Sequence, residues 1–188
     1  LGYFEEIFHK FLRKEDLILE AGCGQGQLVI ALKARGYQVE GIDFAPETVA
    51  RLNKDFPELS IRLGDVKNID VEDGAYSVYI SIGVVEHALA GPMEFLNEAR
   101  RVVRPGGLAF VSVPHINFVR RIKAALGAFQ STPGELPFYQ FAFSKGEFCN
   151  LLDLSGFDVI ETVSYGGYKG TVGEIDLFKK LFELPQGW

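Results

Sequence analysis

Short apolar runs alternate along the chain with stretches in which apolar residues recur every three or four positions. The short runs predict strands, and the periodic stretches predict amphipathic helices. The predicted strands are Leu17–Ala21, Gln38–Asp43, Ser60–Leu63, Tyr76–Ile82, Leu108–Val113 and Phe157–Val163. Strands that alternate with helices indicate βαβ units, so the predicted fold class is α/β, with a mostly parallel sheet and helices on both faces.

The helical stretches have recognisable ends. A first amphipathic helix runs through Phe4 to Leu12, and two later helices begin at Pro46 and Pro92, because proline is favoured in the first turn of a helix. Ser144 and Glu147 have the spacing of a capping box, which predicts another helix start. The prolines and glycines of residues 104–107 predict a turn before the fifth strand.

The length of 188 residues predicts a single domain over residues 1–188. Within it we expect an N-terminal helix over 1–14, a core over 15–114, an insertion over 115–143 and a C-terminal part over 144–188. The insertion follows the fifth strand and falls on the ligand side of the sheet if the connections keep their usual hand. The chain begins at Leu1 rather than at Met, so we expect it to be a trimmed version of something longer.

Composition excludes several classes of function. The formal net charge of −6 and the pI of about 5.1 argue against non-specific binding to nucleic acid or to anionic membranes. No apolar run is long enough to span a bilayer. The two cysteines, Cys23 and Cys149, stand far apart and not at metal spacing, so we expect no metal site and a cytoplasmic location.

The most informative stretch is the turn after the first predicted strand. Gly22, Gly24 and Gly26 occupy alternate positions, whereas a dinucleotide fingerprint requires its third glycine at position 27, which is Gln27 here. Acidic residues stand near the ends of three predicted strands, at Glu20, Asp43 and Asp65. Asp43 suits a ribose diol and Asp65 an exocyclic amine. Three carboxylates favour a cationic or amine-bearing ligand over a pyrophosphate.

Five motifs in this order carry a family resemblance: Glu20–Gly26, Gly41–Phe44, Gly64–Val66, Val84–Ala88 and Arg104–Gly107. Together they resemble the class I S-adenosylmethionine-dependent methyltransferases, and within them the small-molecule branch that includes the ubiquinone-biosynthesis-type enzymes. The resemblance covers roughly residues 15–165. It implies a Rossmann-like sheet of seven strands, the last antiparallel and inserted between the fifth and sixth. No seventh strand is visible before Trp188, so we expect this strand to be missing from the chain.

The resemblance also implies which residues hold the cofactor, S-adenosylmethionine. The three glycines pass under its methionine part, with Glu20 near the ammonium, and the backbone around Ser81 faces the same amine. Asp43 holds both ribose hydroxyls. At the adenine end, Phe44 lies against the ring, and Asp65 accepts a hydrogen bond from the adenine amine beside the N–H of Val66.

Candidates for the acceptor side are fewer. His87 follows the fourth strand and is the candidate general base, since imidazole titrates near neutral pH; alternatively it anchors a loop beside Glu86. His115, Tyr139 and Phe141 are candidates to bind substrate, and the aromatic residues of this insertion are equally consistent with a plain core.

The predicted activity is transfer of a methyl group to a small organic molecule, with oxygen favoured as acceptor atom over nitrogen or carbon. Two alternatives stay open at this stage. One is a nicotinamide-dependent oxidoreductase, against which the glycine spacing argues. The other is a non-catalytic module that only binds S-adenosylmethionine. The oligomeric state does not follow from the sequence.

Overall fold

The structure, a computed structural model, describes residues 2–115 and 141–164. Two compact units are distinguished and are described separately. The larger one spans Phe11–Val159 and contains the sheet. The smaller one has residues 2–10 and 160–164 in the described part of the chain. The single-domain organisation stays a prediction.

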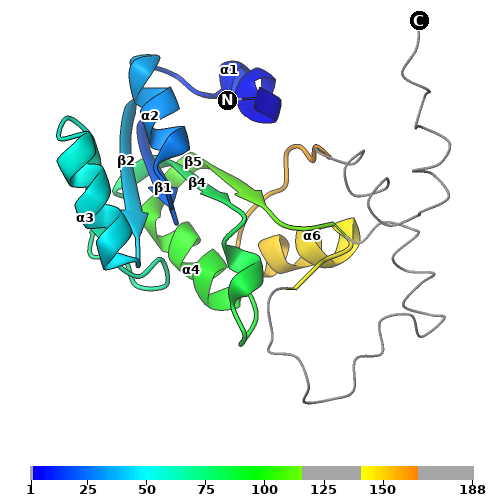
Figure 1. Cartoon of the computed structure of the whole chain (residues 1–188). Coiled ribbons are helices and arrows are strands. Elements are labelled where there is room, and N and C mark those ends of the chain that lie inside the picture. Colours follow the sequence, from blue (N-terminus) through cyan, green and yellow to red (C-terminus); the bar gives the residue numbers. More distant parts are fainter. Residues whose placement is uncertain (1, 116–140, 165–188) are drawn as a thin grey trace, which may run out of the picture. The chain divides into compact units, whose positions relative to one another are not determined.

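The sheet has five strands in the order β3-β2-β1-β4-β5, and every pairing is parallel (Figure 1). The strands are β1 (Leu17–Ala21), β2 (Gln38–Asp43), β3 (Ser60–Leu63), β4 (Tyr76–Ile82) and β5 (Val103–Ser112). The predicted bounds of the first four are confirmed. The strand order reverses between β1 and β4, and in open α/β sheets ligands bind at the carboxyl ends of the strands beside such a point.

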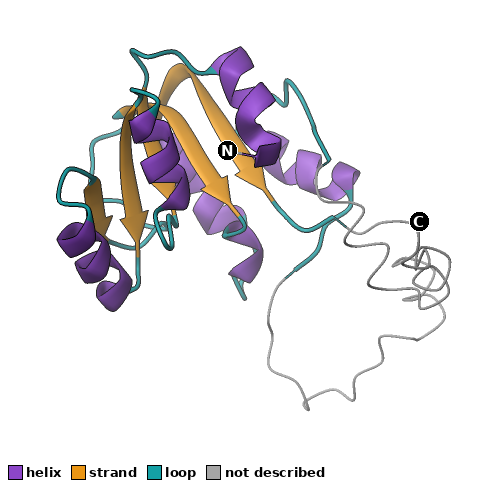
Figure 2. Ribbon diagram, turned by 45° about the horizontal axis from the view of Figure 1, so that its top comes forward, coloured by secondary structure: helices purple, strands orange, loops and turns teal. Residues whose placement is uncertain are grey.

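Helices lie on both faces of this sheet (Figure 2), as predicted. Helices α2 (Gln27–Ala34) and α3 (Pro46–Asp55) pack beside β2 and β3, whereas α4 (Met93–Val102) packs on β4 and β5. The inner strand β4, between β1 and β5, is buried from Tyr76 to Ser81, as expected for a parallel strand that is covered on both sides. The predicted capping box at Ser144 is confirmed and opens α6 (Lys145–Leu154).

The N-terminal helix is also confirmed. A short 3₁₀ turn, η1 (Gly2–Phe4), leads into α1 (Glu5–Phe11). Within the smaller unit, the rings of Phe4 and Phe8 stack with centroids 5.8 Å apart, and Lys10 pairs with Glu161 at 2.7 Å.

The predicted turn at residues 104–107 is a bulge inside β5, which is a correction to the sequence analysis. Val103 is already paired with Tyr76, and the regular register resumes with Leu108 opposite Val78. Between these two pairs, β5 moves on by five residues while β4 moves on by two. Proline and glycine mark this irregularity correctly, but the neighbouring strand keeps the chain extended on both sides of it, so no separate turn forms.

The sixth predicted strand is wrong in the described residues. Residues 157–164 follow Gly156 without regular secondary structure. A strand forms only where a neighbour accepts and donates backbone hydrogen bonds, and β5 is the outermost described strand on that side of the sheet. Residues 157–163 form no strand pairing with β5 or with any other described strand, so their apolar pattern alone did not make them a strand. The helical stretch expected after Gly166 lies outside the described residues.

Candidate cofactor and acceptor site

The glycine turn joins β1 to α2 at the carboxyl edge of the sheet. Gly22, Gly24 and Gly26 have φ angles of 79°, 50° and 71°, a region that L side chains rarely adopt. A Cβ on Gly22 would lie 2.5 Å from a methyl group of Val84, so the loops after β1 and β4 approach too closely for any other residue. A Cβ on Gly24 would meet nothing within 4 Å. The turn is closed towards Val84 and open above Gly24, where a ligand has room.

Asp43, the last residue of β2, holds this turn in place. Its Oδ2 accepts the Gly24 N–H at 2.7 Å, and its Oδ1 accepts the Ala45 N–H at 2.9 Å. The Ile42 carbonyl accepts the N–H groups of both Gly22 and Cys23. Asp43 is 6% exposed. A carboxylate has about four acceptor positions, so each oxygen of Asp43 retains one for a further donor.

Glu20 lies beneath the turn, next to last in β1, and is 6% exposed. Its Oε2 is buried without a hydrogen-bond partner among the described residues. The pKa of Glu20 is raised to about 8, chiefly by burial and also by the charge of Asp43, whereas the Val29 amide in the first turn of α2 lowers it. A buried carboxyl with a free oxygen fits the ammonium group that the resemblance implies for Glu20, because a cation would repay its desolvation.

Cys23 fills space in the turn. It is 5% exposed, and its Sγ lies where a Cβ on Gly41 would come within 3.0 Å. The pKa of the Cys23 thiol is raised to about 12, chiefly by burial and also by the nearby charges of Glu20 and Asp43. A thiol that stays protonated is a poor nucleophile.

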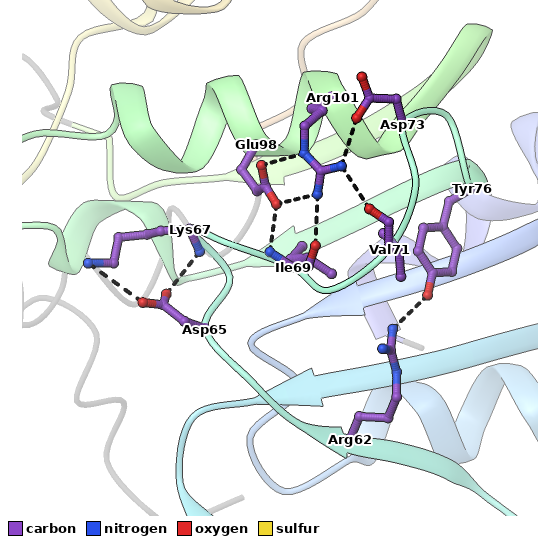
Figure 3. Close-up of polar contacts among 9 residues, drawn as sticks. All are labelled: Arg62, Asp65, Lys67, Ile69, Val71, Asp73, Tyr76, Glu98 and Arg101. Carbon is purple, nitrogen blue, oxygen red and sulfur yellow. Dashed lines mark hydrogen bonds and ion pairs between the residues drawn. The ribbon is translucent and has the colours of Figure 1, made fainter.

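The predicted adenine end lies after β2 and β3. Phe44 directly follows Asp43 and is 80% exposed, so its ring is available to cover a ligand. Asp65 follows β3 and Gly64; its Oδ1 accepts the Lys67 N–H at 2.9 Å, and its Oδ2 lies 3.7 Å from the Lys67 ammonium (Figure 3). Val66 is buried in the core. Phe44 and Asp65 are thus exposed side chains after neighbouring strands.

Two buried polar residues, Ser81 and Glu86, lie at and just beyond the end of β4, and Glu86 was not among the predicted site residues. Ser81 is fully buried one residue before the strand ends. Beyond it, η2 (Val85–His87) carries Glu86, which is 3% exposed and has an Oε2 without a hydrogen-bond partner in the described part of the chain. Burial raises the pKa of Glu86, and the neighbouring His87 opposes this. The sequence pattern did not predict that Glu86 is buried, because a carboxyl between an apolar pair and a histidine is usually exposed.

The acceptor candidates occupy the same edge of the sheet. His87 is exposed at the end of η2. The described ends of the insertion meet each other, since His115 and Phe143 form a parallel bridge and His115 Nδ1 lies 3.2 Å from the Phe143 carbonyl. One of them also contacts η2, because the Phe141 N–H donates to the Glu86 carbonyl at 2.8 Å. His87, His115 and Phe141 therefore share one region, on the predicted side of the sheet. Tyr139 lies outside the described residues.

A separate open hollow of about 490 Å³ runs along β2 and β3. Its polar side chains bond one another: the Tyr76 hydroxyl donates to Glu40 at 2.8 Å and accepts from Arg62 at 2.9 Å. These groups brace three strands and share no residue with the glycine turn. In the described ranges, no group of three or more His, Cys, Asp or Glu side chains could hold a metal ion.

Residues 19–111 match the protein family described as Methyltransferase domain. This stretch of the chain belongs to that family. The match runs from the middle of β1 almost to the end of β5, and so includes both the glycine turn and the η2 region.

Named relatives agree with the family. A probable S-adenosylmethionine-dependent methyltransferase of Mycolicibacterium smegmatis is 31% identical over 160 residues, which are 85% of this chain and 58% of that protein. A ubiquinone biosynthesis O-methyltransferase of Cereibacter sphaeroides is 35% identical over 118 residues, 59% of this chain and 46% of that protein. The chain thus spans about half the length of these curated relatives. The class I resemblance and the S-adenosylmethionine cofactor are confirmed.

Solved structures confirm the fold. An S-adenosylmethionine-dependent methyltransferase of Methanosarcina mazei superposes with a TM-score of 0.69 at 21% identity, over 82% of this chain and 85% of that one. The Burkholderia thailandensis 1,6-didemethyltoxoflavin-N1-methyltransferase, solved with its substrate and S-adenosylhomocysteine, gives 0.64 at 20% identity, over 84% and 67%. None of the helices in the described part of the chain combines the length and apolar character that a membrane span requires.

Proposed function

We propose that this methyltransferase domain transfers a methyl group from S-adenosylmethionine to a small organic acceptor, with an oxygen as the favoured acceptor atom and nitrogen or carbon next. The observation that carries the proposal is the position of Asp43. Its Oδ2 ties the glycine turn to the end of β2 and its Oδ1 accepts the Ala45 N–H, so each oxygen still offers one acceptor position, which suits the two ribose hydroxyls.

The remaining cofactor contacts follow from the same edge of the sheet. Glu20, with its free buried oxygen, receives the ammonium group, and the open space over Gly24 accommodates the methionine part. Phe44 covers the adenine, and Asp65 accepts from its amine beside Val66. When bound, the cofactor supplies an electrophilic methyl group on a sulfonium sulfur. The chain contributes orientation and proximity, which suffice for a large share of the rate of a displacement.

The acceptor site lies beside η2 and the two ends of the insertion. His87 is the candidate base that takes the proton of an acceptor hydroxyl. His115 and Phe141 stand where an acceptor would meet the insertion, and Tyr139 belongs to the same prediction. A small acceptor suits aromatic neighbours such as Phe141 and Phe143, whose rings lie 6.0 Å apart. The absence of nucleic-acid binding and the cytoplasmic location stay predictions from charge and cysteine content.

Calorimetric titration with S-adenosylhomocysteine, with NADH as the control, tests the cofactor site. We expect micromolar binding of the first ligand and none of the second. A screen of small phenols and carboxylic acids with methyl-labelled S-adenosylmethionine then tests turnover. Binding without transfer to any of them would favour the non-catalytic module, and binding of NADH alone would restore the oxidoreductase.

A further inference from the structure

The loop between β3 and β4 carries Asp65 and Val66, yet most of its strong hydrogen bonds are made to helix α4. Figure 3 shows Glu98 and Arg101 of α4 reaching across to residues 69–73 of this loop. The two side chains stand three residues apart, so they lie on the same face of the helix and bind each other as well as the loop.

Arg101 is the centre of this network. Its Nη2 donates to the Ile69 carbonyl at 2.7 Å, and its Nη1 donates to the Val71 carbonyl and to Asp73 Oδ1, both at 2.8 Å. Its Nε and Nη2 also donate to the two oxygens of Glu98 at 2.9 and 2.7 Å. Only a planar guanidinium with five donors can satisfy this set, so Lys cannot replace Arg101 without losing most of it.

Glu98 adds a bond in the opposite direction. Its Oε1 accepts the Ile69 N–H at 2.6 Å, so Ile69 is held through both its N–H and its carbonyl. Glu98 is 8% exposed, and the hydrogen bonds from Arg101 keep its pKa below the ordinary value for a glutamate. The network acts on the backbone of the loop, because three of its partner atoms are main-chain atoms of Ile69 and Val71.

In the described part of the chain, the Asp65 turn has mostly local bonds, and its side-chain link to α4 is the exposed 3.9 Å ion pair of Lys67 with Glu94, which contributes little. The Asn68 N–H donates to the Asp65 carbonyl at 3.0 Å, and the Asp65 side chain is 55% exposed beside Lys67. Such bonds shape the turn but do not set its position on the protein. Its anchors are β3 on one side and Ile69 on the other, and Val66 packs in the same buried cluster as Ala99 and Val102 of α4.

We propose that Glu98 and Arg101 are positioning residues for adenine recognition, which they serve by fixing the loop that presents Asp65 and the Val66 N–H. This inference rests on the proposed role of Asp65 towards the adenine amine. Neither Glu98 nor Arg101 touches the ligand. Loosening their network moves the Asp65 turn relative to β2. This weakens the contacts to the adenine more than the contacts to the rest of the cofactor.

The test compares two ligands by calorimetry, S-adenosylhomocysteine and S-inosylhomocysteine, in which an oxygen replaces the adenine amine. The wild type should prefer the adenosyl compound by about tenfold or more, because the inosyl compound leaves Asp65 without a donor. Arg101→Lys and Glu98→Gln should each lower this preference by about threefold to tenfold, chiefly through weaker binding of the adenosyl compound. Thermal unfolding of each variant establishes that it is folded.

Arg100→Lys is the matched control. It alters the neighbouring guanidinium, which donates to the Gly156 carbonyl at 3.1 Å and does not reach the loop, and it should leave the preference unchanged. Should Arg101→Lys not fold, the near-isosteric Glu98→Gln decides.

Asp65→Ala separates the positioning role of Glu98 and Arg101 from the proposed role of Asp65 itself. If it abolishes the preference while the α4 variants leave the ratio of affinities unchanged, the positioning role is overturned. If Asp65→Ala itself leaves that ratio unchanged, the role of Asp65 falls, and the inference with it.

Discussion

The two ends of the site differ in how they are built. At the glycine turn, backbone N–H groups donate to Asp43 and to the Ile42 carbonyl at the end of β2, and Glu20 lies buried beneath them. At η2, exposed His87 and His115 stand beside aromatic residues, and backbone contacts such as that of Phe141 to Glu86 bring the insertion to the sheet. The cofactor end is a socket of backbone atoms and buried carboxyl groups, whereas the acceptor end is a surface with exposed side chains.

This difference explains why the cofactor is identified and the acceptor is not. A socket made of backbone atoms tolerates few residue types, so its sequence pattern is specific. On a surface of side chains, substitutions can change which acceptor binds and still leave the fold intact. The sequence pattern of such a surface therefore says little about the acceptor. Variants at the two ends should therefore separate cleanly into effects on turnover and effects on cofactor binding.

The largest expected effect is at the acceptor end. His87→Ala should lower the rate of methyl transfer by roughly 10²–10⁴ if the imidazole removes the acceptor proton, because that is the usual contribution of a positioned base. The affinity for S-adenosylhomocysteine should not change, since His87 lies outside the glycine turn. The measurement is single-turnover transfer of a labelled methyl group to the best phenol of the acceptor screen.

A matched control is His9→Ala, which removes another exposed imidazole, on α1. It should leave the rate unchanged. A loss of less than tenfold in His87→Ala would make His87 a structural residue beside Glu86, and the base would have to be sought elsewhere at the acceptor end.

At the cofactor end, Asp43→Ala should weaken the binding of S-adenosylhomocysteine by on the order of 1.5–3 kcal/mol, since two charge-assisted bonds to ribose are lost. This corresponds to about tenfold to a hundredfold in affinity. The melting temperature should also fall, because the N–H groups of Gly24 and Ala45 lose their acceptor. Calorimetry and thermal unfolding measure the two effects.

Asp55→Ala provides the comparison, because it removes an exposed carboxylate from the end of α3. It should change neither quantity. An Asp43→Ala variant that binds the ligand as tightly as the wild type would remove Asp43 from the cofactor site and with it the observation on which the proposed function depends.

The sequence predicted the parts of the molecule that depend on local pattern. The bounds of β1 to β4, the glycine turn and the acidic strand ends follow from apolar runs and from glycine spacing, both of which act over a few residues. The bulge of β5, the unpaired residues 157–163 and the Glu98–Arg101 network do not, because each depends on a neighbour far along the chain. The same holds for Glu20: its position was predicted, but its protonation depends on burial.

The smallest expected effect is the pH dependence of cofactor binding, which tests the role of Glu20 at the cofactor end. Burial raises the pKa of Glu20 to about 8, so its carboxyl holds a proton at pH 7 in the free protein. The ordinary pKa of a glutamate is 4.5, so in the unfolded chain this carboxyl has lost its proton well below pH 7. The folded state thus binds one more proton between these two values, and the contribution of Glu20 to the unfolding free energy falls as pH rises through this window.

Binding of the ligand ammonium should reverse that protonation. The carboxylate form of Glu20 pairs with the cation, so binding at pH 7 releases a proton, and affinity should rise about fivefold between pH 7 and pH 8 and then level off. Titrations at pH 7 in phosphate and in Tris, whose heats of ionisation differ, count the released protons. Glu20→Gln should give the same heat in both buffers. A wild type that also does so would mean that Glu20 is already charged, and that the socket meets the ammonium group with other atoms.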